Sequence, residues 1–186
     1  AFVAASLLTK LWLDSRQIRH VAGHRAHVPP AFADEISLEQ HQRAAAYTLD
    51  KLRFGLISGA IGTALLIGWT LLGGLHALNE LVRGLVQSHW GALPYQLALL
   101  GAFTFISGLI DLPLSAWSTF RIEQKHGFNR MSWSMWLGDL VKQTLVGVIL
   151  GAPIAALILW LMGAAGQQWW LWAWVAWVSF SLLLMV

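Results

Sequence analysis

The sequence predicts an all-α integral membrane protein with five transmembrane helices. Of its 186 residues, 57% are hydrophobic and only 11% are charged, whereas about a quarter are charged in an ordinary soluble domain. The mean hydropathy is +0.60. A spanning helix needs about 20 mostly apolar residues, and several runs of the chain meet or approach that length. A soluble globular fold is therefore excluded.

Five apolar runs are the predicted spans. They cover residues 1–13, 54–75, 95–120, 144–165 and 169–186. The three middle runs are long enough to cross the bilayer, and Asp111 is the one charged residue among them. The first run is too short to span, and the last reaches residue 186 without a basic cluster, Gly or Pro to stop it. We expect both of these helices to be truncated.

Basic residues predict the orientation of the chain. The connections 14–53 and 121–143 together hold ten Lys and Arg residues, whereas the connection 76–94 holds only Arg83. By the positive-inside rule, loops 14–53 and 121–143 are cytoplasmic, and the chain after residue 186 emerges on the same side. The compact loops favour a bacterial inner membrane. This placement of the basic residues reports topology, so no nucleic-acid partner is expected.

Local signals predict some order in the connections. Pro29-Pro30 blocks a continuous helix, and Ser37 followed by Gln40 is a capping-box pattern that starts a new one. Nothing interrupts that helix before residue 54, so the second span should extend into the cytoplasm. In the external connection, apolar residues at helical spacing predict an amphipathic helix along the membrane surface: Leu78, Leu81, Val82, Leu85 and Val86.

The chain offers no convincing metal site or catalytic residue. It contains no cysteine and no H-E-x-x-H sequence, in which two His bind zinc and the Glu acts as general base. His20 and His24 are four residues apart and His27 follows, but Gly23 weakens a helix there and no carboxylate stands beside them to orient the rings. We therefore expect neither catalytic residues nor a bound metal in this segment.

Asp111 is the one carboxylate deep in a predicted span, two residues before Pro113. Intramembrane charges are costly and usually face a bundle interior or a water-filled cavity, which makes Asp111 a candidate functional residue. The alternative is a structural hydrogen bond or an ion pair to a neighbouring helix. A transporter would use Asp111 as a proton or ion carrier.

The most distinctive string, Ile122 to Asn129, follows the third span directly and reads I-E-Q-K-H-G-F-N. Gly127 can adopt the left-handed conformation that ends a helix, and either Asn129 or Ser132 can cap the next one. On physical grounds alone the string predicts an interfacial helix-turn-helix.

This string closely resembles the I-E-x-K-H-G-F-N signature of the CAAX prenyl protease 1 family of integral-membrane zinc metalloproteases. The similarity extends upstream to Leu112-Pro113, Ser115 and Thr119-Phe120, and downstream to Asp139 and Lys142. A second block resembles the family's first cytoplasmic loop, and its residues occur in the family's order: Arg16-Gln17, His27-Val28-Pro29-Pro30, Tyr47, Asp50-Lys51 and Phe54.

The resemblance implies that this chain is the N-terminal membrane region of a larger zinc endopeptidase. In that family a seven-helix barrel surrounds a water-filled chamber, and the zinc site follows the fifth span, so the catalytic zinc domain is expected after residue 186. The expected partners are the lipid bilayer, the chain's own C-terminal catalytic domain, and a peptide or protein substrate, either of the CaaX type or a membrane protein. The segment alone should be inactive and should bind no zinc.

The resemblance assigns ten residues to the family motif and to docking of the loops on the catalytic domain. They are Arg16, Gln17, Tyr47, Lys51, Glu123, Lys125, His126, Gly127, Phe128 and Asn129. Two other classes of protein are alternatives: a membrane scaffold without protease activity, and a transporter that uses Asp111.

Overall fold

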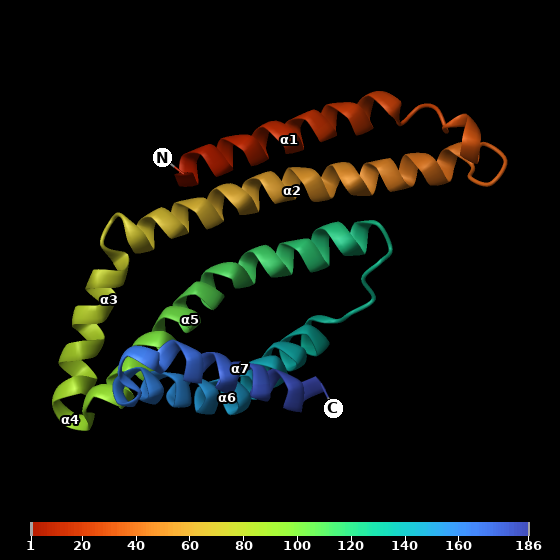
Figure 1. The fold of residues 1–186 in the computed structure, drawn as a ribbon. Coiled ribbons are helices and arrows are strands. Elements are labelled where there is room, and N and C mark those ends of the chain that lie inside the picture. The colour runs from red at the N-terminus through yellow and green to blue at the C-terminus, as the bar shows by residue number, and fades with distance from the viewer. Residues whose placement is uncertain (1, 186) are drawn as a thin grey trace. The chain divides into compact units, whose positions relative to one another are not determined.

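The computed structural model describes residues 2–185, and every regular element within them is helical. The chain forms two units, residues 1–74 with 108–130 and residues 75–107 with 131–186. The first unit contains α1 and α2, shown in red to yellow in Figure 1, and the C-terminal end of α5. The second contains α3, α4, the start of α5, α6 and α7. The all-α membrane architecture that the sequence predicts is confirmed.

The first helix is longer than its apolar run. α1 spans Phe2–His24, eleven residues beyond the predicted end of the first span at residue 13. Ile18 and Val21 are half-buried, as Leu11 is, so the face that packs on α2 continues through the polar stretch. That packing outweighs the expected weakening by Gly23.

The second helix, α2, spans Leu38–Thr70 and lies antiparallel beside α1 (Figure 1). The Oγ of Ser37 accepts a hydrogen bond from the Gln40 backbone N–H, and the Gln40 side chain accepts one from the Ser37 N–H. This confirms the predicted capping box and the extension of α2 before residue 54. The helix ends at Thr70 rather than residue 75, and Gly73 follows with a φ of +81°, the left-handed conformation that is common just after a helix.

The connection after α2 is helical throughout most of its length. α3 spans Gly74–Val82, a π-helical turn covers Arg83–Gln87, and α4 is the single turn Ser88–Trp90. Leu78 and Val82 are buried, whereas Leu81 and Leu85 are exposed. The predicted apolar face therefore exists, but it divides into a packed row and a row that is free to face lipid.

The third span is one continuous helical segment. α5 spans Ala92–Trp117 and passes into a π-helical turn over Ser118–Glu123. The predicted limits of 95–120 fall within it, and Pro113 lies inside the helix without ending it. The π-helical turn carries the segment into the motif that begins at Ile122.

The last two helices pack against each other in the second unit. α6 spans Trp133–Ala164, and a 3-10 turn over Gly166–Gln168 leads into α7 over Trp169–Met185. α6 therefore begins eleven residues before the predicted start of the fourth span at residue 144. Residue 186, the expected end of the fifth span, lies outside the described residues, as does residue 1.

Within residues 2–185, four helical segments are long and apolar enough to cross a membrane: Leu38–Thr70, Ala92–Glu123, Trp133–Ala164 and Gly166–Met185. Their most apolar stretches have no buried residues, which is the expected state of side chains that meet lipid or further protein. α1 is not among the four, in agreement with the shortness of its apolar run.

Candidate functional site at the ends of α2 and α5

Glu123 connects the end of α5 to α2. Its Oε1 accepts a hydrogen bond from Lys51 Nζ at 2.7 Å, and the hydroxyl of Tyr47 donates to Oε1 at 3.0 Å and is 3.1 Å from Oε2. Tyr47 and Lys51 are four residues apart and therefore share a face of α2. Two donors from one helix thus hold a single carboxylate from another part of the chain.

Asp50 makes the reciprocal connection. Its Oδ2 accepts a hydrogen bond from Lys125 Nζ at 2.7 Å and lies 2.9 Å from His126 Nε2. Neighbouring residues of opposite charge on α2, Asp50 and Lys51, therefore pair with residues of opposite charge after α5. We call the six side chains Tyr47, Asp50, Lys51, Glu123, Lys125 and His126 the α2–loop cluster.

The charges of the cluster lie outside the uncharged runs, since Asp50 and Lys51 precede residue 54 and Glu123 follows residue 120. The hydrogen bond from Lys125, followed by the bond to His126, holds the pKa of Asp50 below its ordinary value. The bond from Lys51 likewise lowers the pKa of Glu123, and the bond to Glu123 raises the pKa of Lys51. The contacts therefore favour the charged forms of Asp50, Lys51 and Glu123.

A helix C-cap at Gly127 positions the loop residues. Gly127 has a φ of +80°, a conformation in which a side chain is disfavoured. The Phe128 N–H donates to the Glu123 carbonyl at 2.9 Å and the Gly127 N–H donates to the Gln124 carbonyl at 3.1 Å, which is the Schellman pattern. The predicted role of Gly127 is confirmed, and the cap fixes Glu123 and His126 on the final turn.

The structure distinguishes the two candidate caps for the next helix. The Ser132 Oγ accepts a hydrogen bond from the Met135 N–H at 3.3 Å and caps α6. Asn129 instead points back, and its Nδ2 donates to the Thr119 carbonyl at 3.1 Å. The Thr119 carbonyl also accepts a hydrogen bond from the Gln124 N–H in the π-helical turn, so the Asn129 amide adds a second donor to it.

Apolar packing supports the polar contacts. Ala45 and Leu49 of α2 and Ile122 of the motif are buried, and each lies within two residues of a member of the cluster. The Tyr47 ring lies 4.8 Å from the Phe128 ring and 5.2 Å from the His126 ring. Phe128 is nevertheless 67% exposed, so much of its ring remains available for contact.

Three sequence-based candidates lie outside the cluster. Arg16 and Gln17 are on α1, where the Arg16 guanidinium lies over the Trp12 ring at 5.6 Å, and no hydrogen bond to the cluster is found for either of them within residues 2–185. Asp111 is exposed on α5, twelve residues before Glu123.

The histidines of the first loop are also separate from the cluster. His20 and His24 are both on α1, with ring centroids 4.2 Å apart. The Nδ1 of His24 lies 2.8 Å from the His20 carbonyl, and His41 Nε2 lies 3.2 Å from the His24 carbonyl. Across the described part of the chain, no three His, Cys, Asp or Glu side chains gather closely enough to hold a metal ion.

Sequence reasoning did not assign a role to Asp50. The spacing of Tyr47, Asp50 and Lys51 places all three on one face of a helix, and the opposite charges of the adjacent pair were the available signal. The sequence did not identify Glu123, Lys125 and His126 as their partners, because a hydrogen bond across 72 residues leaves no local pattern.

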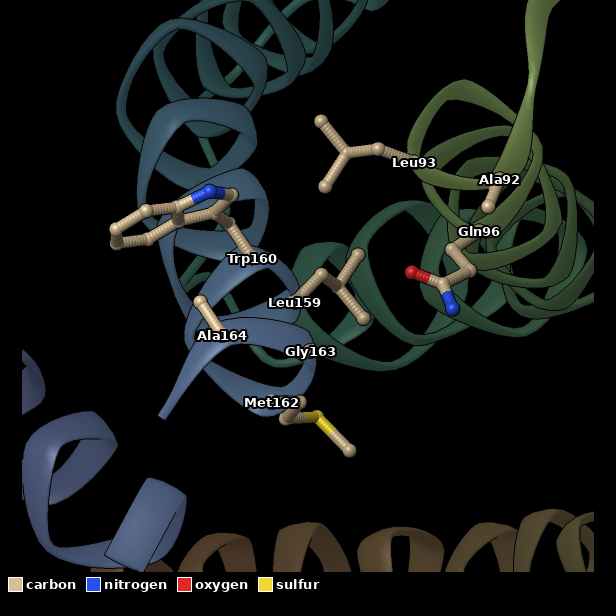
Figure 2. Close-up of a pocket in the computed structure, with 8 residues that line it drawn as sticks. All are labelled: Ala92, Leu93, Gln96, Leu159, Trp160, Met162, Gly163 and Ala164. Carbon is tan, nitrogen blue, oxygen red and sulfur yellow. The ribbon is translucent and has the colours of Figure 1, made fainter. Parts of the chain in front are cut away.

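The second unit contains an open groove of about 590 Å³ between the start of α5 and the end of α6 (Figure 2). Its lining residues are Ala92, Leu93, Gln96, Leu159, Trp160, Met162, Gly163 and Ala164. None of these side chains titrates or acts as a nucleophile, so the groove is not the candidate site.

The fold and the cluster define the class of protein. It is a multi-pass α-helical membrane protein in which two ion pairs join α2 to the segment after α5. Residues 17–186 match the family described as CAAX prenyl protease N-terminal, five membrane helices. The chain belongs to this family, which confirms the resemblance of the I-E-Q-K-H-G-F-N string.

Individual relatives agree with the family assignment. The chain is 30% identical to the CAAX prenyl protease 1 homolog of Arabidopsis thaliana over 99% of its own length and 44% of the relative's. It is 31% identical to the human CAAX prenyl protease 1 homolog over 95% of its length and 38% of the relative's. The crystal structure of S. mikatae Ste24p matches with a TM-score of 0.90 at 25% identity, covering 100% of this chain and 43% of that one. The chain thus spans less than half the length of these relatives.

Proposed function

We propose that the chain is the membrane domain of a zinc metalloendopeptidase and forms part of the wall of the chamber around its active site. Membership of the family supports this proposal, as do relatives named CAAX prenyl protease 1. In the complete protein, the proposed reaction is hydrolysis of a peptide bond. The first candidate substrate is a prenylated CaaX-type protein, and the second is a membrane protein. The relatives favour neither the scaffold nor the transporter that uses Asp111.

The residues described here do not form a set of ligands that fits the zinc of the proposed enzyme. His20 and His24 come closest to a ligand pair, but the His24 Nδ1 contacts a backbone carbonyl, and residues 2–185 bring no third ligand to them. We therefore propose that the zinc ligands lie in the catalytic domain and derive no catalytic step from this chain.

The α2–loop cluster carries the proposal for what this chain contributes. It holds loops 14–53 and 121–143 together through Lys51–Glu123 and Asp50–Lys125, and it leaves the Phe128 ring exposed beside them. We propose that this preformed surface docks the catalytic domain, with Phe128 as an apolar contact. Gln17 on α1 remains a proposed member of the surface, whereas Arg16, the other sequence-based candidate on that helix, lies over the Trp12 ring.

We propose that both loops are cytoplasmic, from the positive-inside asymmetry. The family assignment supports a multi-pass membrane protein. The two curated relatives named above come from Arabidopsis thaliana and from human, so they lend no support to a bacterial inner membrane, and we do not retain that part of the proposal.

Charge reversal in the full-length protein tests the docking role. Lys51→Glu should reduce hydrolysis of a prenylated CaaX peptide because it places two carboxylates together, and adding Glu123→Lys should restore much of it. Arg43→Glu is the matched control, since Arg43 pairs only with Glu39 on an exposed face of α2. Activity that is equal in Lys51→Glu and Arg43→Glu proteins would contradict the proposal.

A further inference from the structure

Six exposed arginines in the first unit lack acidic partners among residues 2–185: Arg16, Arg19, Arg25, Arg53, Arg121 and Arg130. Three of them lie near the ends of the apolar runs. Arg16 is on α1, Arg53 is on α2 and Arg121 is on the π-helical turn after α5. Among residues 2–185, none of the three has a carboxylate within ion-pair distance, whereas Lys51 and Lys125 do. Within this part of the structure, lysines pair with Asp50 and Glu123, and the three arginines have no such partner. Among the described residues, Asp14, two residues before Arg16, is not paired with a lysine.

Contacts between the helices place the three arginines at one level. The Nζ of Lys10 lies 3.4 Å from where a Cβ on Gly59 would be. Because α1 and α2 run antiparallel (Figure 1) and a lysine side chain reaches about one helical turn, Arg16, six residues after Lys10, lies within about one turn of the level of Arg53, six residues before Gly59.

A second contact relates the level of α2 to that of the C-terminal end of α5. Lys51 bonds Glu123 at 2.7 Å, and α5 runs antiparallel to α2. Arg53, two residues after Lys51, is therefore level with Arg121, two residues before Glu123. We call Arg16, Arg53 and Arg121 the arginine row.

Tryptophans lie one helical turn to the apolar side of the row. The guanidiniums of Arg16 and Arg121 lie 5.6 Å and 5.8 Å from the ring centres of Trp12 and Trp117. Both rings are more than half exposed, at 57% and 58%. Exposed indoles are typical of the headgroup region of a bilayer, and stacking on them holds each guanidinium just outside that depth.

The row also marks the limit of the uncharged runs. Arg53 immediately precedes the run 54–75, and Arg121 immediately follows the run 95–120, whose one charge is Asp111. At this depth the most abundant anionic groups are lipid phosphates. A guanidinium binds phosphate through two parallel N–H donors, and basic residues near the surface favour anionic lipids.

We propose that the arginine row is a binding site for the headgroups of anionic phospholipids, with Trp12 and Trp117 packing beside the bound lipid. The proposal does not depend on protease activity. Its main rival is that the three arginines pair with acidic side chains of the catalytic domain, in which case the full-length protein would show no lipid preference there.

Native mass spectrometry of the full-length protein tests this site. The detergent-purified protein is mixed with equal amounts of phosphatidylglycerol and phosphatidylcholine, and the lipids that it retains are counted. We expect preferential retention of phosphatidylglycerol, by about fivefold for each arginine that contributes. Equal retention of the two lipids by the unmodified protein would overturn the proposal.

Variants locate the site. Arg16→Gln, Arg53→Gln and Arg121→Gln together should abolish the preference. The corresponding lysine replacements keep the charge that distinguishes the two lipids for the protein and should restore most of the preference. The control variant, with Arg25→Gln, Arg43→Gln and Arg130→Gln together, removes the same charge elsewhere in the first unit and should retain the preference.

If the triple variant of the row does not fold, Arg53→Gln alone should lower the preference about fivefold, and it leaves the stacking of Arg16 and Arg121 on Trp12 and Trp117 unchanged because Arg53 stacks on neither ring. An equal preference in the row and control variants, or in Arg53→Gln and unmodified protein, would overturn the assignment.

Discussion

The Lys51 Nζ lies 2.7 Å from the Oε1 of Glu123, which is 72 residues further along the chain. This bond and its reciprocal partner, Asp50 with Lys125, join α2 to the segment that follows α5. Because neighbouring residues on α2 carry opposite charges, an exchange of their positions would bring Asp50 to Glu123 and Lys51 to Lys125, which are pairs of like charge. The pairs therefore specify the register of the two helices as well as stabilising it.

Glu123→Gln should lower the stability of the full-length protein by about 1 kcal/mol. The substitution removes the charge that Lys51 and Tyr47 share, but the Lys51 side chain is 42% exposed, so water screens much of the loss. Thermal unfolding in detergent measures the change. Glu80→Gln is the control, because Glu80 pairs with Arg83 on an exposed surface and should change stability by less than about 0.5 kcal/mol. An equal loss in both variants would contradict the structural role of Glu123.

The contribution of the cluster should depend on pH at both extremes. The pKa values of Asp50 and Glu123 are lowered in the folded protein, so their stabilisation is present above their unfolded values of about 4 and is lost as the pH falls through the folded values. The pKa of Lys51 is raised, so its contribution is present below about pH 10.4 and is lost as the pH rises through the folded value.

Comparison with the Asp50→Asn, Glu123→Gln double variant isolates this pH dependence. The difference in melting temperature between unmodified and variant protein should be constant near neutral pH and should shrink below about pH 4. A difference that stays unchanged as the solution is acidified to about pH 3 would show that the two carboxylates do not supply it.

Gly127→Ala should destabilise the protein by about 1–2 kcal/mol, because a Cβ is disfavoured at a φ of +80°. No atom lies within 4 Å of the position of that Cβ, so the cost arises from the backbone alone. Gly147→Ala in α6 also meets open space and should be neutral or stabilising, by up to about 1 kcal/mol. Thermal unfolding of the two variants, each compared with unmodified protein, measures the two changes in stability. A smaller loss of stability at position 127 than at position 147 would rule out the C-cap.

Asp111→Asn tests the remaining alternative. In a protease, the full-length protein should show no ion or proton flux in reconstituted vesicles, with or without this substitution. A transporter that uses Asp111 should show flux that the asparagine variant loses. Peptide hydrolysis and vesicle flux are measured on the same preparations, and an Asp111-dependent flux would favour the transporter.

Much of the helical architecture could be predicted from the sequence. The uncharged runs located the central parts of α2, α5, α6 and α7, because lipid-facing helices need long apolar stretches. Local chemistry also predicted the capping box at Ser37 and the left-handed glycine at position 127. These features depend on residues that are close together in the chain, which is why they are visible in the sequence.

The exact limits of the helices and the pairing of residues in the α2–loop cluster were harder to predict from the sequence. α1 continues to His24 and α6 begins at Trp133, because helices extend through polar residues once one face is packed or a serine caps the start. The hydrogen bonds from Lys51 to Glu123 and from Lys125 to Asp50 join distant segments, so no local pattern pairs them. The family motif identified most of these residues, but it did not indicate that they bind one another.

The most direct test of the account compares peptide hydrolysis by the full-length protein and by residues 1–186 alone. Both are supplied with zinc and a prenylated CaaX peptide, and product is measured with and without a chelator. The account predicts chelator-sensitive cleavage by the full-length protein and none by residues 1–186. Zinc-dependent cleavage by residues 1–186, or its absence from the full-length protein with both CaaX and membrane-protein substrates, would contradict it.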